Sequence, residues 1–263
     1  MSLLSPERLI IGLAPERLSA LRVEGYWRPR IGERYERALP ATPGERWEAP
    51  LAALEVLLDQ PDWAARDLTV ILSNHYVYYA VLPASQGLAA SEQNDLAHLV
   101  FRNLFGELSH DWDLRVSHAG DLPTLASAVP QAFLKALYDI CEGRGRLRSI
   151  QPAWMAVFNG VRQQLEGDNG ILALVEAGRI GLATLEQGQW RSIVSRAGPG
   201  SMLPQFLADE SERYGRRPGE ALWLCDLTGE AQAPSGAAWH LQPLTLPGAV
   251  AKGTSRLADW GFQ

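Results

Sequence analysis

A strand–turn–strand pattern near the start of the chain recurs in its second half, and this repeat limits the possible folds more than any other feature. The first copy has apolar strands at residues 9–14 and 18–23, and the second has them at residues 171–175 and 179–185. Self-similarity at a fixed spacing constrains the topology of a whole chain. The repeat therefore predicts an α/β protein made of two related halves that face each other across a cleft.

The two copies also agree in detail. Arg179 ends the turn of the second copy 162 residues after Arg17 ends the turn of the first. A Trp-Arg pair follows a Gly turn in each copy, at Trp27-Arg28 and at Trp190-Arg191. Third strands are predicted at residues 26–31 and 190–194, so each copy becomes a three-stranded antiparallel meander. Chance alignment of two meanders is the alternative, and it would leave an unrelated α/β binding module.

Helices and further strands are predicted around the two copies. Periodic apolar residues predict helices at residues 47–58, after Ser91, after Pro130, after Pro152 and around 202–207. Apolar or alternating runs predict strands at residues 68–73, 77–82, 112–116, 122–129 and 221–225. The helix capped by Ser91 is expected to bury Leu96, Leu99, Val100 and Leu104. We expect a first half at residues 1–167, with a smaller subdomain inserted at about 76–130, and a second half at 168–263.

Composition excludes several classes of function. The chain has 24 Lys and Arg residues against 30 Asp and Glu, a net charge of −6, which argues against a nucleic-acid binder. Its longest apolar stretches are only about six to eight residues, well short of the roughly 20 that cross a bilayer. Pro6-Glu7-Arg8 interrupts any signal-peptide core. The sequence predicts a cytoplasmic protein without a membrane span of its own.

Catalytic and metal-binding patterns are missing. The five His residues are dispersed, and Cys141 and Cys225 fit neither zinc nor redox spacing. No Gly-x-Ser-x-Gly elbow is present. Ser73 and His75 are near neighbours in the sequence, but such pairs rarely form a working dyad and no acid is placed to orient the histidine. We therefore expect no catalytic residue and no metal ion.

The hairpin turns are the candidate ligand-binding elements. Backbone N–H groups of a Gly-rich turn bind phosphate, and a carboxylate before the turn can hold magnesium through water. The second-half turn supplies both kinds of group, in Glu176 and Gly178, whereas residues 14–17 read Ala-Pro-Glu-Arg and lose one N–H to proline. Gly198 and Gly200 precede a predicted helix, where an anion is also favoured. The plain alternatives are an ordinary hairpin turn and an ordinary loop.

Three stretches in order resemble the actin-like ATPase superfamily, and within it the PilM-type proteins of bacterial type IV pilus assembly. They are LIIGLAPERLSALRV, then LTVILSNHYVYYAVLP with the helices and strands after it, then RLRSIQPAWMAVFNGV leading into ILALVEAGRIGLATLEQGQW. The cytoplasmic domain of GspL-type type II secretion proteins is similar to the same arrangement. The resemblance implies a duplicated actin-like (ribonuclease H-like) fold.

The resemblance also implies that the nucleotide site of the family is altered in this chain. Ala14 falls where the family's first phosphate turn has Asp, and Glu176 and Gly178 match the second turn. A late strand and turn that would touch the nucleoside end in the single Gly229, where the family often has two glycines. These departures imply a pseudo-ATPase with no cofactor, or with ATP and magnesium bound weakly and not hydrolysed. The competing hypothesis is an active ATPase or sugar-kinase-like enzyme that uses Glu176.

A partner is implied as well. Tyr76 and Tyr78 lie on one face of a predicted strand and Tyr79 on the other, so one face could contact a protein. PilM-type proteins hold the cytosolic N-terminal tail of a single-pass inner-membrane protein in a groove of their first half. By resemblance, this chain is a scaffold of a pilus or secretion platform, peripheral at the inner membrane, and Tyr76, Tyr78 and Tyr79 are candidate partner-binding residues.

Overall fold

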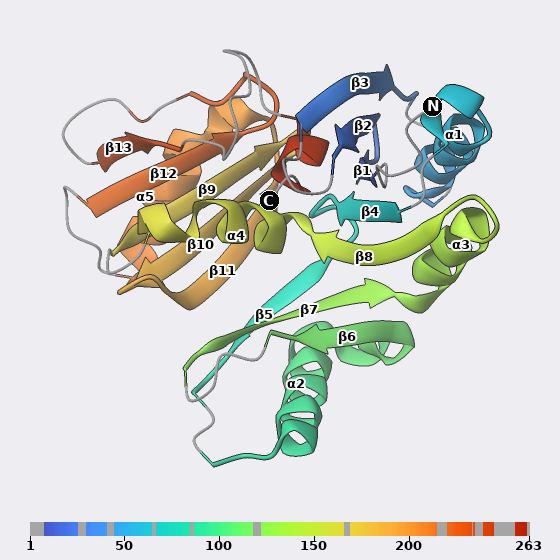
Figure 1. Cartoon of the computed structure of the whole chain (residues 1–263). Helices are drawn as coiled ribbons and strands as arrows, with labels where there is room; N and C mark the ends of the chain where they lie inside the picture. Colours follow the sequence, from blue (N-terminus) through green and yellow to red (C-terminus); the bar gives the residue numbers. More distant parts are fainter. Residues whose placement is uncertain are drawn as a thin grey trace.

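The computed structural model describes residues 8–25, 30–40, 45–64, 67–84, 87–117, 122–165, 169–214, 220–232, 234, 239–244 and 256–261. These residues form two five-stranded sheets and one three-stranded sheet, with helices packed against them (Figure 1). The Trp27-Arg28 pair lies outside the described residues.

The first sheet contains the first copy of the repeat. Its order is β3 (Arg30–Ala38), β2 (Arg17–Glu24), β1 (Arg8–Ala14), β4 (Asp67–Leu72) and β8 (Arg146–Pro152). The first three strands are antiparallel neighbours, and β4 and β8 run parallel to β1. Strands β1 and β2 are almost entirely buried, as their apolar sequences require.

The second sheet repeats this topology strand for strand. Its order is β11 (Gln189–Ala197), β10 (Arg179–Glu186), β9 (Gly170–Glu176), β12 (Glu220–Asp226) and β13 (Trp239–Pro243). The first three strands are again antiparallel, and β12 and β13 again run parallel to the first strand of the copy. The two halves predicted from the repeat are therefore confirmed.

The three-stranded sheet is formed by β5 (Tyr78–Leu82), β7 (Thr124–Pro130) and β6 (Trp112–Val116), in that order. Helix α2 (Ala90–Phe105) and the 3-10 helix η2 (Gly106–Asp111) lie beside it (Figure 1). The helix buries Ala97 and Phe101 against the sheet. All of these elements lie within the segment predicted as a smaller subdomain, whose bounds stay a prediction.

Helices on the two large sheets define the cores. Helices α1 (Glu48–Leu58) and α3 (Gln131–Cys141) pack with one face of the first sheet, and α5 (Leu203–Tyr214) packs with one face of the second. Short 3-10 helices lie at η1 (Pro61–Trp63) and η3 (Gly200–Met202). Helix α4 (Ala153–Leu165) shares one core with residues of both sheets, including Ile71 and Leu174. The two halves are thus joined by a continuous apolar core.

Close packing of α4 on the second sheet requires a glycine. A Cβ atom on Gly181, in β10, would lie 2.7 Å from Cζ2 of Trp154, which is fully buried at the start of α4. Carbon atoms in van der Waals contact lie about 3.5–4.0 Å apart, so no larger side chain fits without displacing the indole.

The last described segment, η4 (Leu257–Gly261), returns to the first half. Leu257 and Trp260 are buried in the core that α4 shares with both sheets. Arg34 in β3 forms a salt bridge of 3.0 Å with the buried Asp259. The segment therefore joins the end of the chain to its first sheet.

Several predicted elements differ from the structure. The third strand of the first copy was predicted at residues 26–31, of which 26–29 lie outside the described residues. It runs over Arg30–Ala38, and most of this length was missed because a charged edge strand carries no apolar signal. Strands β8 and β13 and the segment η4 were not predicted. Ser91 does not cap α2: Ala89 is the N-cap, and its N–H donates to the Glu92 carboxylate at 2.7 Å.

The predicted buried stripe of α2 was wrong in part, although Val100 does pack against the core of the small sheet. Leu99 and Leu104 are 53% and 61% exposed, whereas Phe101 is fully buried. Phe101 packs beside Phe105 and Trp112, with ring centroids 5.5 and 6.5 Å away. The aromatic residues therefore turn toward the sheet and leave the leucines outside.

Candidate functional site

The turn between β4 and β5 places a first-half loop against a hairpin of the second half. The N–H of Ser73 donates to the carbonyl of Leu13 at 2.9 Å, and the N–H of His75 donates to the Ser73 hydroxyl at 3.2 Å. These bonds fix the backbone of the turn, so that Asn74 and His75 meet the β9–β10 hairpin. Two pockets open beside this contact.

Glu176 is the centre of the contact. Its carboxylate accepts the backbone N–H of Asn74 at 3.1 and 3.3 Å, and the residue is only 4% exposed. Burial raises the pKa of this carboxyl, while the Ser73 side chain and the Asn74 N–H act in the opposite direction. The structure thus points the predicted magnesium-holding carboxylate at the first half of the protein.

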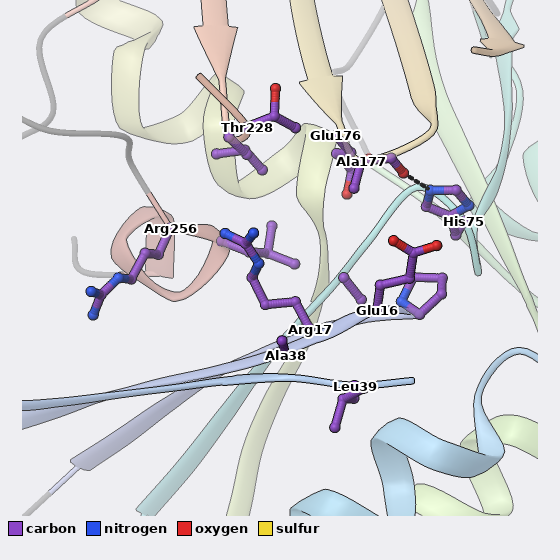
Figure 2. A pocket seen from close by; sticks show the side chains of 13 residues that line it. Glu16, Arg17, Ala38, Leu39, His75, Glu176, Ala177, Thr228 and Arg256 are labelled. Carbon is purple, nitrogen blue, oxygen red and sulfur yellow. Dashed lines mark hydrogen bonds between the residues drawn. The ribbon is translucent and has the colours of Figure 1, made fainter. Parts of the chain in front are cut away.

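His75 adds a second bond between the halves. Its Nε2 lies 2.9 Å from the carbonyl oxygen of Ala177, which can only accept, so Nε2 carries the proton (Figure 2). Burial lowers the pKa of His75 to about 4, although the bond to Ala177 opposes this. The ring is therefore neutral at pH 7, and Nδ1 is an acceptor.

The first pocket lies between the two halves and encloses about 270 Å³ (Figure 2). It is lined by Ala14, Pro15, Glu16, Arg17, Ala38, Leu39, His75, Glu176, Ala177, Leu227, Thr228, Arg256 and Leu257. Two arginines contribute positive charge, but both pair with Glu36: Arg17 at 2.9 Å and Arg256 at 2.8 Å. The carbonyl of Glu16 accepts the N–H of Leu39 at 2.8 Å.

The predicted glycines lie in turns next to this pocket but do not line it. Gly178 has φ +70°, which favours glycine, and its carbonyl accepts the N–H of Gly198 at 3.0 Å. A Cβ on Gly200 would lie 3.0 Å from the backbone nitrogen of Ala231. The structure therefore brings Gly178 and Gly198 together, and it packs Gly200 against the segment that follows Gly229.

The turn after β12 is held by its own carboxylate. Asp226 accepts the N–H groups of Thr228, Gly229 and Ala231 at 2.8, 3.0 and 3.0 Å, and also the Thr228 hydroxyl at 2.7 Å. Gly229 has φ +77°, again a glycine conformation. These N–H groups therefore already donate hydrogen bonds to Asp226 within the protein.

The second pocket, which we call the aromatic groove, encloses about 430 Å³ on the other side of the turn. It is lined by Glu45, Arg46, Trp47, Asn74, His75, Tyr76, Val77, Tyr78, Pro130, Phe133 and Arg179. Phe133 stacks on Trp47 with ring centroids 5.7 Å apart and packs against Tyr76 at 4.9 Å. Tyr78 stacks on Trp112 at 3.9 Å and is 38% exposed.

Two of the three predicted partner-binding tyrosines line this groove. Tyr76 is buried, and its hydroxyl donates to the carbonyl of Arg46 at 3.2 Å. Tyr79 does not line the groove; its hydroxyl donates to the Asn74 side-chain oxygen at 2.6 Å, and burial raises its pKa well above the ordinary value. Sequence analysis missed Arg46 and Phe133 as site residues and saw Arg179 only as the end of a turn.

Other kinds of site lack support. Within the described ranges, no three His, Cys, Asp or Glu side chains gather as metal ligands would. The described helices include none that is both long and apolar enough to cross a membrane.

Neither a protein-family model nor a curated protein sequence matches this chain. Solved structures do match its fold. A Bacteroides thetaiotaomicron protein with an actin-like ATPase fold and unknown function is 12% identical, with a TM-score of 0.62 over 83% of this chain and 81% of that one. A chain of the PilM–PilN type IV pilus biogenesis complex is 13% identical, with a TM-score of 0.65 over 84% of this chain and 81% of that one.

The cytoplasmic domain of EpsL, an inner-membrane component of the Vibrio cholerae type II secretion system, is 17% identical. Its TM-score is 0.60 over 91% of this chain and 90% of that domain. Together with the duplicated sheets, these likenesses show that the chain has the actin-like ATPase fold.

Proposed function

We propose that this protein is a cytoplasmic scaffold of a type IV pilus or type II secretion platform at the inner membrane. In this role it binds the cytosolic N-terminal tail of a single-pass membrane protein in the aromatic groove. The observation that carries the proposal is the groove itself, which encloses about 430 Å³ and is lined by the partly buried Trp47 and the exposed Tyr78. Aromatic residues in partly open pockets are the usual anchors of peptide binding.

The likeness to the PilM–PilN complex and to the EpsL domain supports the choice of platform. Both structures have this fold over more than four fifths of the chain. The groove also lies beside the predicted smaller subdomain, because β5 directly follows the turn that lines the groove and α3 supplies Phe133.

The second part of the proposal is that nucleotide is not hydrolysed, and is bound weakly or not at all. Pro15 has no N–H to offer a phosphate, and the Glu16 carboxylate in the same turn repels one. Glu176 accepts a first-half N–H, and Asp226 takes the N–H groups of the turn after β12. The inter-half pocket keeps an ATP-binding enzyme as the alternative.

Isothermal calorimetry tests the scaffold proposal. The ligands are synthetic peptides of the cytosolic tails of the single-pass membrane proteins encoded beside this gene. One of them should bind, and Tyr78→Ser should weaken it, while Tyr138→Ser, an exposed tyrosine of α3 outside the groove, should not. No binding of any tail up to high micromolar concentration would contradict the proposal.

A further inference from the structure

The aromatic groove contains polar nitrogen atoms that the protein leaves without partners. Nε of Arg179 and Nδ1 of His75 are buried and have no hydrogen-bond partner. Nδ2 of Asn74 is near enough to Glu176 to favour its charge, yet no acceptor lies at hydrogen-bond distance. All three residues line the groove. Buried polar atoms without partners cost free energy and are explained when a ligand satisfies them.

Positive charge in the groove is only partly compensated. Arg179 is half-buried, and among the described residues its guanidinium donates only to the Ser195 hydroxyl, at 2.7 Å. No carboxylate of the described residues lies within 4.0 Å of Arg179 or of Arg46. Burial lowers the pKa of Arg179, the charge of the nearby Glu176 opposes this, and the charge of Arg46 lowers the pKa further. Two neighbouring cations that share one buried acid, with no ion pair within 4.0 Å, favour an anionic occupant.

The charge of that occupant follows from the acids nearby. Glu176 is buried behind the groove and is bonded to Asn74, and Glu45 is exposed at the rim. These two carboxylates oppose a multiply charged group such as a phosphate. Because solvent screens the exposed Glu45, the buried Glu176 offsets one of the two arginine charges, and about one positive charge remains. A single carboxylate matches this charge, and its two oxygens suit the planar fork of an arginine.

We propose that the aromatic groove binds one carboxylate, the side chain of an acidic residue in the partner's tail, through Arg179 and Arg46. The inference rests on the proposed function and names the residue type that the groove selects. Trp47 and Tyr78 then contact the apolar residues on either side of the acidic one, and the buried Phe133 supports Trp47 from behind. Nδ1 of His75 is an acceptor without a donor in the protein, and a backbone N–H group of such a peptide is a donor of the right kind.

Nuclear magnetic resonance with small probes tests this without knowledge of the partner. The probes are N-acetyl-aspartate methylamide and its uncharged match, N-acetyl-asparagine methylamide, and the signal is the indole N–H of Trp47, assigned with Trp47→Phe. The aspartate probe should shift the signal, less so at high salt, and the asparagine probe should bind about tenfold or more weakly. Equal binding of both probes, or no shift with either, would overturn the inference.

Charge-removing variants locate the contact. Arg179→Gln should abolish the difference between the two probes. Arg46→Gln, at an exposed residue whose loss cannot unfold the protein, should reduce it. Arg191→Gln removes an equally positive but exposed residue of β11, paired with Glu186 at 3.7 Å, and should leave the difference unchanged. A probe difference that survives in both groove variants would place the carboxylate elsewhere and overturn the inference.

Peptides separate this inference from the proposed function. If a tail peptide binds the groove and replacement of its acidic residue by the amide changes nothing, the scaffold function stands and the carboxylate inference fails. If the small probes behave as expected and no tail peptide binds, the inference about the groove's chemistry stands and the proposed partner is wrong.

Discussion

The carboxylate of Glu176, in the second half, accepts the backbone N–H of Asn74, in the first half, at 3.1 and 3.3 Å. The sequence resemblance predicted Glu176 as the acid of a second phosphate turn. Here the acid joins the halves, and the turn that it holds separates the inter-half pocket from the aromatic groove. The same few residues therefore control both the stability and the two candidate binding sites.

Glu176→Ala should lower the free energy of unfolding by about 1–3 kcal/mol, because a buried N–H of Asn74 loses its acceptor. Glu176→Gln should cost less, since its amide oxygen can still accept. Chemical denaturation measures both, and the exposed Glu186→Gln serves as the control. An alanine variant as stable as the native protein would show that this contact contributes nothing.

The stability of the protein should depend on His75 between about pH 6.5 and pH 4. The folded-state pKa of about 4 lies below the ordinary 6.5, so the unfolded chain binds the proton first as the pH falls. The contribution of neutral His75 is present above pH 6.5 and is lost through that range, up to about 3 kcal/mol.

His75→Gln isolates this effect. The charges of Arg179 and Arg46 also lower the pKa of His75, and Glu176 lines the inter-half pocket with it, but all three residues are present in both proteins. The difference in unfolding free energy between native and variant, measured from pH 7 to pH 4, should shrink toward acid. A difference that stays constant with pH would contradict the neutral, buried state of His75.

Gly181→Ala should destabilise the protein by about 1–3 kcal/mol through overpacking against Trp154. Gly32→Ala is the matched control in an edge strand, where the new Cβ would lie close only to the end of the flexible Glu24 side chain and in ordinary contact with the carbonyl of Arg22, and should change stability by less than about 0.5 kcal/mol. Thermal unfolding of the two variants compares them. Equal melting temperatures would mean that α4 does not pack closely on β10.

Mg-ATP should not raise the melting temperature of the native protein. The N–H groups after β12 are bonded to Asp226, and both arginines of the inter-half pocket pair with Glu36. A ligand that binds only the folded state would stabilise it measurably. A magnesium-dependent shift that disappears in Glu176→Ala and Gly178→Val would instead support the ATP-binding alternative.

Sequence patterns were sufficient to predict the strands that are buried on both faces. Residues 9–14 and 171–175 are apolar because both faces of these strands are covered, so the repeat and the paired sheets were predictable. Strand β3 was placed wrongly because its residues are mostly charged at a sheet edge. The buried face of α2 depends on aromatic contacts with Trp112, which no periodicity reveals.

The candidate site was predictable only in part. Tyr76 and Tyr78 were found because they alternate in the sequence, although only Tyr78 lies in strand β5 and Tyr76 lies in the turn before it. The role of Arg179 depends on a second-half hairpin that meets a first-half turn, and Phe133 reaches the groove from α3. Such long-range neighbours leave no local signal in a single sequence.

Hydrogen exchange of the protein with and without a bound tail peptide tests the central claim most directly. The account predicts slower exchange at residues 45–47, at 74–78 and at the start of α3, which together line the aromatic groove. The turns at residues 14–17 and 226–229 should exchange unchanged. Protection confined to the exposed face of α2 or to the inter-half pocket would contradict the account.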